Sequence, residues 1–459
     1  MNKIKILLAL LITLFSMCDM HGQDNKDYNL KAYEVPDIAR NTLDFSLMAT
    51  GAYHKSKHEI DDLTSKAYSF SGGFKSMFNR YTDTRKFFGS HKALLGIHNY
   101  KARTPATTDM DYESKQKTFY ANVYYSNISR FYFKDNFFFA TGGSLQYEFN
   151  RMKIRSYTEK ETTLQAEIPV GIGMGRMKNV TEVHQAIYIL QELTKKNILK
   201  RELSSDETLA LAQIMATAKN KRFLNAGKRM RTEVNQVDSF FIANNMFADN
   251  TTAYSTILRD FWKTSDLFER KAGIVYSAGI NTSYNYQKKK MEEPGLSRNG
   301  SMDNDWFSFN PFLLLQYENP VSVHWQHTAT LSPNFDYTEI KSGDNENTNK
   351  GFQIDALYRL GFYPTPRTNI SLTATEKMRW GKHAFKYSIQ PTTNSTSFSA
   401  STQLALDLCY YVTHNIRVTG SATLQHSYSK SKIPLLDTNP YVIKGITASY
   451  MIGLAYVLY

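Results

Sequence analysis

Most of the chain alternates between apolar and polar residues with a period of two, which predicts β-strands with one apolar face. Residues 445–459 show the pattern well, because Ile446, Tyr450, Ile452 and Leu454 share one face and small or weakly polar residues share the other. Strands of about ten residues with apolar outer faces and aromatic girdles are what a membrane-spanning barrel requires. The alternative for this stretch alone is an ordinary buried edge strand.

The same pattern recurs along the chain, apart from one central region. The candidate strands are residues 43–57, 67–79, 91–101, 118–133, 136–154, 163–176, 272–286, 306–317, 321–337, 352–363, 368–378, 398–412, 416–428 and 445–459. This is ~14 strands, and bacterial single-chain barrels have even strand numbers. The sequence therefore predicts an all-β transmembrane barrel of about 14 antiparallel strands.

The connections between these strands differ in length. Those near residues 134, 318, 364 and 413 are tight, whereas residues 102–115, 288–305, 341–350, 379–396 and 429–442 form long polar stretches. Tight and long connections alternate throughout the second half of the chain. Membrane barrels have short periplasmic turns and long external loops, so this alternation assigns a side to each connection.

A helical insertion interrupts the barrel pattern. From residue 180 to about 266 the apolar residues follow helical spacing, starting with Val183, Ile187 and Leu190. Asn179 or Thr181 is expected to cap the first helix, Ser204 with Glu207 forms a capping box for the second, and Asp249 or Asn250 is expected to cap the fourth. The predicted organisation is a signal peptide at 1–22, a periplasmic lead-in at 23–42, the first barrel part at 43–176, the insertion at 177–269 and the second barrel part at 270–459. The insertion takes the place of one of the short turns in this alternation, so we expect it to lie in the periplasm.

Composition agrees with a barrel and excludes a helical membrane protein. Aromatic residues make up 14% of the 459 residues, yet the mean hydropathy is −0.45. The formal net charge is +13, but the basic residues are dispersed. Anionic lipid groups are therefore favoured as partners over nucleic acid.

The first residues resemble a secretory signal. Lys3 and Lys5 precede the apolar residues 6–15, which are too few to span a membrane, and cleavage is expected after Gly22. Cys18 offers a lipoprotein alternative, which the preceding Met17 disfavours. After cleavage only Cys409 would remain, so no internal disulfide is expected.

Two motifs resemble known outer-membrane proteins. Gly453-x-x-Tyr456-x-Leu458 with the terminal Tyr459 resembles the C-terminal strand that the barrel assembly machinery of bacteria recognises, although Met451 departs from that pattern. The junction GMGRMKNVTEVHQAIYILQEL resembles uncharacterised Bacteroidota barrel proteins, as does a mature chain that begins with Gln23. The resemblance implies the outer membrane of a Gram-negative bacterium, with its lipids and assembly machinery as partners. It transfers no activity.

Polar residues whose phase directs them into the barrel are the candidates for a pore. They are Glu148, Glu167, His324, Asp336, Asp355, Arg359, Lys377, Asp407 and Arg417. Such residues set the selectivity of a pore or join in ion pairs that fill a plugged lumen. His324 and His327 are expected to point to opposite faces of one strand, which argues against a two-histidine metal site. No hydrolase, metal or dinucleotide motif is convincing, so no catalytic residue, metal or cofactor is predicted and the chain is expected not to be an enzyme.

The insertion carries a basic stretch with three interpretations. Its members are Lys219, Lys221, Arg222, Lys228, Arg229 and Arg231. They could bind lipid phosphates of the inner leaflet, dock a periplasmic protein or peptidoglycan, or form an ordinary solvated helix face. The sequence thus favours a pore or transporter for small solutes or lipids. The alternative is a structural or export-associated anchor whose helical insertion binds a periplasmic partner and whose lumen is plugged.

Overall fold

A computed structural model describes residues 30, 33–58, 63–104, 114–134, 136–154, 157–221, 226–248, 253–265, 267–292, 300–343, 345–387, 390–413, 416–432 and 441–456. This part of the chain contains one 14-stranded sheet in which every strand pairs antiparallel with its sequence neighbours. The strands are β1 Ile38–His58, β2 Leu63–Asp83, β3 Phe87–Thr104, β4 Ser114–Phe133, β5 Phe137–Ile154, β6 Tyr157–Asn179, β7 Lys271–Glu292, β8 Gly300–Pro320, β9 Trp325–Ser342, β10 Asn345–Thr365, β11 Thr368–Tyr387, β12 Gln390–Tyr411, β13 Ile416–Lys432 and β14 Tyr441–Tyr456. The predicted number and direction of the strands are confirmed.

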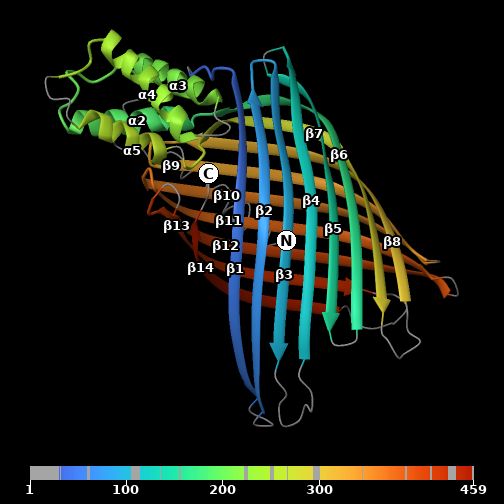
Figure 1. Ribbon diagram of the computed structural model, residues 1–459. Helices are drawn as coiled ribbons and strands as arrows, with labels where there is room; N and C mark the ends of the chain where they lie inside the picture. Colours follow the sequence, from blue (N-terminus) through green and yellow to red (C-terminus); the bar gives the residue numbers. More distant parts are fainter. Residues whose placement is uncertain are drawn as a thin grey trace.

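The sheet curls around an interior, as Figure 1 shows. Hydrogen-bonded pairing runs from β1 to β14 in sequence order, and over the described residues these two edge strands do not pair with each other. The sheet is therefore a strongly curved barrel wall that is not closed.

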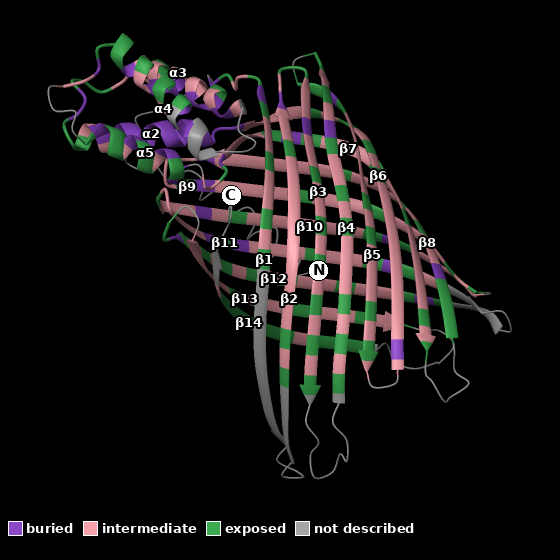
Figure 2. Cartoon of the chain, in the orientation of Figure 1, coloured by how far each residue is buried: buried purple, intermediate pink, exposed green. Residues whose placement is uncertain are grey.

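One face of the sheet is apolar and exposed. In β6, Ile168, Val170 and Ile172 are exposed, Ile172 to 64%, and they alternate with Glu167 and small residues. Similar runs of exposed apolar side chains occur in most of the other strands. Figure 2 shows exposed positions along several of these strands in green. A belt of this kind is unfavourable in water and suits contact with lipid. We call the opposite, more polar face the inner face.

The strands are much longer than their apolar parts. They span from 16 residues in β14 to 23 in β6, about twice the ~9–11 residues that cross a bilayer. Two predicted long loops are consequently wrong, because residues 343–344 alone join β9 to β10 and residues 388–389 alone join β11 to β12. Beyond the apolar belt both faces are polar, so the alternation ends there. The backbone pairing continues because it does not depend on that alternation.

Four helices form a domain of their own between β6 and β7. They are α2 Thr181–Lys195, α3 Ser205–Ala218, α4 Ala226–Ala243 and α5 Tyr254–Thr264, with the short 3₁₀ helix η2 Lys219–Lys221 after α3. This helical domain encloses an apolar core that includes Val183, Leu211, Phe241 and Trp262. It lies at the end of the sheet where β1 begins and where β8 and β10 turn back (Figure 1). No helix in the described part of the chain is both long and apolar enough to cross a bilayer.

The helix caps test the sequence interpretation in detail. The capping box of α3 is confirmed, since Glu207 N–H donates to Ser204 Oγ at 3.2 Å and Ser204 N–H donates to Glu207 Oε2 at 2.8 Å. Val180 is the N-cap residue of α2, while the Asn179 side chain accepts the Thr181 N–H at 3.0 Å. For α5 the N-cap residue is Ala253, and Asp249 and Asn250 lie outside the described residues.

The predictions made from the chain ends also concern residues outside the described ranges. Residues 1–29 and 457–459 are not described, so the signal peptide and the last residues of the assembly motif stay predictions. The domain limits drawn from the sequence likewise stay predictions.

Candidate functional site

The inner face carries polar side chains that are held by short hydrogen bonds. Glu167 accepts hydrogen bonds from Ser144 at 3.1 Å and from Asn281 at 2.6 Å. Glu148 accepts from Tyr120 at 2.5 Å and from Gln146, which lies on the same strand. Both glutamates thus lie on the face that the sequence predicts.

The second half of the sheet adds groups of both signs to the inner face. Asp336 forms an ion pair with Arg379, and Asp355 lies directly opposite Lys377 in the register of β10 and β11. The remaining candidates alternate with outward apolar residues: Arg359 donates to Thr373 at 3.1 Å, Arg417 donates to Tyr411 at 3.5 Å, and Asp407 lies between Leu406 and Leu408. A hollow of about 310 Å³ on this face is lined by Pro169, Asn281, Asn310, Phe312, Ser332 and Asn334.

His324 does not line the interior as predicted. Strand β9 begins one residue later, at Trp325, and His324 belongs to the turn after β8. Its Nδ1 lies 2.8 Å from the Tyr363 carbonyl oxygen, and its ring packs against Tyr188 of α2 at 6.3 Å between centroids. The sequence predicts a strand from residue 321, but residues 321–324 form a turn although their sequence alternates as in a strand. His324 is therefore part of the contact between the barrel rim and the helical domain.

Arg270, which the sequence interpretation missed, fastens that contact. Its side chain is buried, and it donates to Gln326 Oε1 at 2.6 Å and to the carbonyl oxygens of Val323 at 3.0 Å, Ser322 at 3.1 Å and Trp325 at 3.3 Å. The guanidinium also lies 4.0 Å from the centre of the Tyr363 ring. Burial lowers the pKa of Arg270. A single arginine thus holds the segment between α5 and β7 against the β8–β9 turn.

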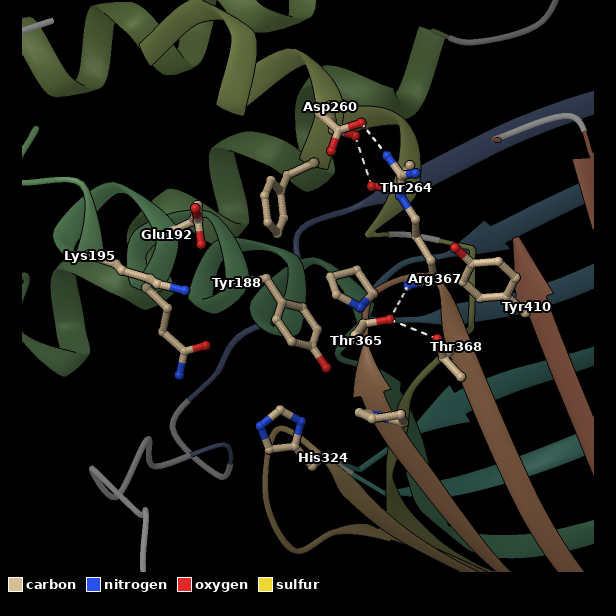
Figure 3. A pocket seen from close by; sticks show the side chains of 14 residues that line it. Tyr188, Glu192, Lys195, Asp260, Thr264, His324, Thr365, Arg367, Thr368 and Tyr410 are labelled. Carbon is tan, nitrogen blue, oxygen red and sulfur yellow. Dashed lines mark hydrogen bonds and ion pairs between the residues drawn. The ribbon is translucent and has the colours of Figure 1, made fainter. Parts of the chain in front are cut away.

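A second contact borders a cleft of about 520 Å³ between α2, α5 and the rim turns (Figure 3). Asp260 of α5 accepts a 2.5 Å hydrogen bond from Arg367, which lies in the β10–β11 turn. The Tyr188 hydroxyl donates toward the carbonyl oxygens of Val323 and Tyr363, both at 3.3 Å. Burial raises the pKa of Tyr188 to about 12. The cleft offers polar groups of both signs, and those labelled in Figure 3 come from the two sides of the contact.

The helical domain is also tied to the first strand. Arg40 of β1 forms a 2.8 Å ion pair with the buried Glu182 of α2 and donates to the Ala216 carbonyl at 3.2 Å. The Asn220 side chain donates to the Asp37 carbonyl at 2.7 Å, just before β1. The domain therefore bridges the first strand and the turns before β9 and β11, two parts of the wall that are far apart in the sequence.

Lys219 is not part of a basic surface. It is 1% exposed, lies 3.5 Å from Glu182 and donates to Gln185 Oε1 at 2.5 Å, with its ammonium group 5.5 Å from the Trp262 ring centre. The prediction that Lys219 binds lipid or a partner is therefore wrong. The 3₁₀ turn after α3 directs it inward, which helical periodicity could not indicate. The side chains of Lys221, Arg222, Lys228, Arg229 and Arg231 lie outside the described part of the structure.

One antiparallel sheet with an apolar outer face and a polar inner face is the architecture of outer-membrane β-barrels. No family model matches this chain, and no curated protein matches it. Among solved structures, it is similar to the translocator domain of the autotransporter NalP from Neisseria meningitidis, with 9% identity, TM-score 0.29, and coverage of 84% of this chain and 96% of that one. It is also similar to the TodX monoaromatic hydrocarbon channel, with 6% identity, TM-score 0.29, and coverage of 92% and 89%.

A third similar structure is also an outer-membrane protein. This is OmpT, an outer-membrane protein of Vibrio cholerae, with 8% identity, TM-score 0.23, and coverage of 92% of this chain and all of that one. The prediction that the chain is not an enzyme is corrected, because it rested only on missing signature motifs, and a barrel fold by itself does not decide whether a protein has an activity.

Proposed function

We propose that this protein is an integral outer-membrane barrel through whose interior small solutes or lipids pass, with the helical domain on the periplasmic side. The contrast between the two faces of the sheet carries the proposal. The outer face presents a continuous apolar belt to lipid, and the inner face presents separate polar groups with room between them. Outer-membrane lipids and the barrel assembly machinery are the partners that such a protein requires.

Conductance tests the pore directly. Purified protein in planar bilayers should give discrete current steps, and Lys377→Glu should shift the reversal potential in a salt gradient toward cation preference. Lys382→Glu is the matched control, because Lys382 lies on the same strand but on the outer face and should leave the reversal potential unchanged. Current no higher than the lipid background would contradict an open pore.

Cysteine labelling tests the orientation. In a Cys409→Ser background, Ser301→Cys at the end far from the helices should react with a membrane-impermeant maleimide in intact cells. Gln236→Cys on the exposed side of α4 should react only after the outer membrane is permeabilised. The reverse pattern would place the helical domain outside.

The second candidate function is an outer-membrane anchor for a periplasmic partner, and the structure of the helical domain favours it. The domain has its own core, is fixed to the rim, and leaves Ile242 of α4 67% exposed. A photo-crosslinking residue at position 242 of the full-length protein should then capture a periplasmic protein or peptidoglycan. The same residue at position 172 in the apolar belt should capture only lipid or assembly factors.

A further inference from the structure

A serine, a histidine and an asparagine meet on the inner face of three neighbouring strands. His383 of β11 lies opposite Asn349 of β10 in the register, and its Nδ1 is 2.7 Å from Asn349 Oδ1. Its other ring nitrogen, Nε2, is 2.9 Å from the Oγ of Ser397 on β12. The three side chains are half-buried, and they lie toward the end of the barrel that is far from the helical domain.

The hydrogen-bond chemistry fixes the direction of both contacts. The amide oxygen of Asn349 can only accept, so Nδ1 of His383 must carry the proton that is shared with it. In the neutral imidazole, Nε2 is then unprotonated and accepts the hydroxyl proton of Ser397. This is the arrangement of a nucleophile, a general base and a group that orients the base.

A glycine makes the contact between serine and histidine possible. Gly381 is the register partner of Ser397, and a Cβ placed on it would lie 2.9 Å from Ser397 Oγ and 3.1 Å from His383 Nε2. Any side chain at 381 would therefore push between the two reacting groups. The hydrogen bond crosses above β11 only because this residue has no side chain.

A positively charged residue, Arg379, lies two residues before Gly381 on the same face of β11. Arg379 forms an ion pair with Asp336, and its buried Nε has no hydrogen-bond partner within the described structure. Its positive charge favours negative charge that develops on a substrate oxygen nearby. Asp336 neutralises part of this charge, so the effect is electrostatic assistance and not a complete oxyanion hole.

From this geometry we propose that Ser397, His383 and Asn349 form a hydrolytic site for carboxylic esters inside the barrel. Ser397 Oγ attacks the ester carbonyl carbon while His383 Nε2 takes the hydroxyl proton. The tetrahedral intermediate collapses, the carbon–oxygen bond to the alcohol breaks, and the alcohol leaves with the proton from Nε2. A water molecule then attacks the acyl-serine, gives its proton to Nε2, and releases the acid as the serine recovers its hydrogen. Asn349 acts as a positioning residue that maintains the tautomer of His383.

Covalent labelling and ester turnover by the full-length protein in detergent test the site. A fluorophosphonate probe should label Ser397, as read by peptide mass spectrometry, and p-nitrophenyl butyrate should be hydrolysed at a rate that rises with pH as one group loses a proton. Ser397→Ala and His383→Gln should each reduce kcat/KM by at least ~100-fold. Ser399→Ala, the next inward position on β12, is the matched control and should keep the full rate.

Two further variants separate a catalytic network from a structural one. Asn349→Ala should lower kcat and shift the midpoint of the pH profile, whereas Asn349→Asp, which still accepts from Nδ1, should restore the rate. Gly381→Ala should abolish labelling, while its barrel remains folded by heat-modifiable gel mobility. Equal labelling of the wild type and Ser397→Ala, or hydrolysis unchanged in His383→Gln, would overturn the proposal. Neither result depends on whether the barrel conducts ions, so the proposed pore is tested separately.

Discussion

Replacing Arg270 by alanine is expected to release the helical domain from the barrel rim. The side chain is 3% exposed and satisfies three carbonyl oxygens of the β8–β9 turn as well as the Gln326 amide oxygen. Alanine would remove all four donors at once. The Tyr188 hydroxyl still donates to the Val323 carbonyl, and the Val321 and Ser322 N–H groups still donate to the Trp325 carbonyl. The turn should therefore keep its shape and the strands should stay paired, while the contact made by Arg270 is lost.

The expected loss in the free energy of docking follows from these contacts. Hydrogen bonds from a charged donor contribute ~1.5–3 kcal/mol each, which gives an upper limit of about 6–12 kcal/mol for the four of them. Two effects reduce this value: the variant no longer buries a charge, and water at the rim can hydrate the exposed carbonyl groups. We therefore expect a loss of about 3–5 kcal/mol in the free energy of docking, roughly half of that upper limit.

Hydrogen exchange read by mass spectrometry measures this docking directly. A loss of 3–5 kcal/mol corresponds to exchange that is roughly 100 to 4,000 times faster in the backbone amides of residues 321–326 and of the first turn of α2. Arg201→Ala is the control, because Arg201 pairs with Glu207 on an exposed surface where such pairs contribute ~0–1 kcal/mol. Exchange within threefold of the wild type in Arg270→Ala would refute the role assigned to this arginine.

Three further predictions concern the helical domain. Ser204→Ala should destabilise α3 by about 1 kcal/mol, measured as faster exchange of its first-turn amides, whereas Ser239→Ala in the interior of α4 should not. Burial, with the nearby Arg270 charge, lowers the pKa of His184 to about 3 from its usual 6.5; the unfolded chain therefore binds the extra proton, and stability should fall between pH 6.5 and pH 3 by ~1.4 kcal/mol per pH unit. His184→Gln should flatten that dependence in an acid titration of the near-ultraviolet circular dichroism. Lys219→Met should lower the free energy of unfolding by ~3–5 kcal/mol, because the buried negative charge of Glu182 loses a neighbouring positive charge. The double variant Lys219→Met with Glu182→Gln should recover part of that stability in thermal unfolding.

Local patterns in the sequence predicted the structure correctly where the two sides of a strand or helix face different environments. The alternation in residues 163–176 predicted the outer and inner faces of β6. The stripe of Val183, Ile187 and Leu190 predicted that α2 contributes to a helical core, although all residues from Thr181 to Leu190 are buried, the polar ones included. The Ser204–Glu207 spacing predicted a capping box because both of its hydrogen bonds form within one helical turn. These features depend on neighbours in the chain, which the sequence contains.

The same patterns fail where both faces are polar or where the chain turns. The residues on either side of 343–344 and 388–389 belong to strands, but their sequence resembles that of loops. Water solvates both faces of the sheet beyond the apolar belt, so both faces are polar there. The alternation around His324 was extended through a turn, and the spacing that placed Lys219 on a surface ended at the 3₁₀ helix. A periodic pattern cannot report a change of backbone geometry at a single residue.

The sequence by itself determined the barrel wall, its two faces and the helical insertion, because each follows from the periodicity of apolar residues. The tertiary structure decided how the insertion sits on the rim through Arg270 and Asp260, and which inner side chains meet. Asn349, His383 and Ser397 come from three strands, and only the register of β10, β11 and β12 brings them together. The register of a hairpin is set by its turn and by the pattern of its strands. The sequence analysis assigned residues 341–350 and 379–396 to loops, so it could not place Asn349 and His383 on paired strands.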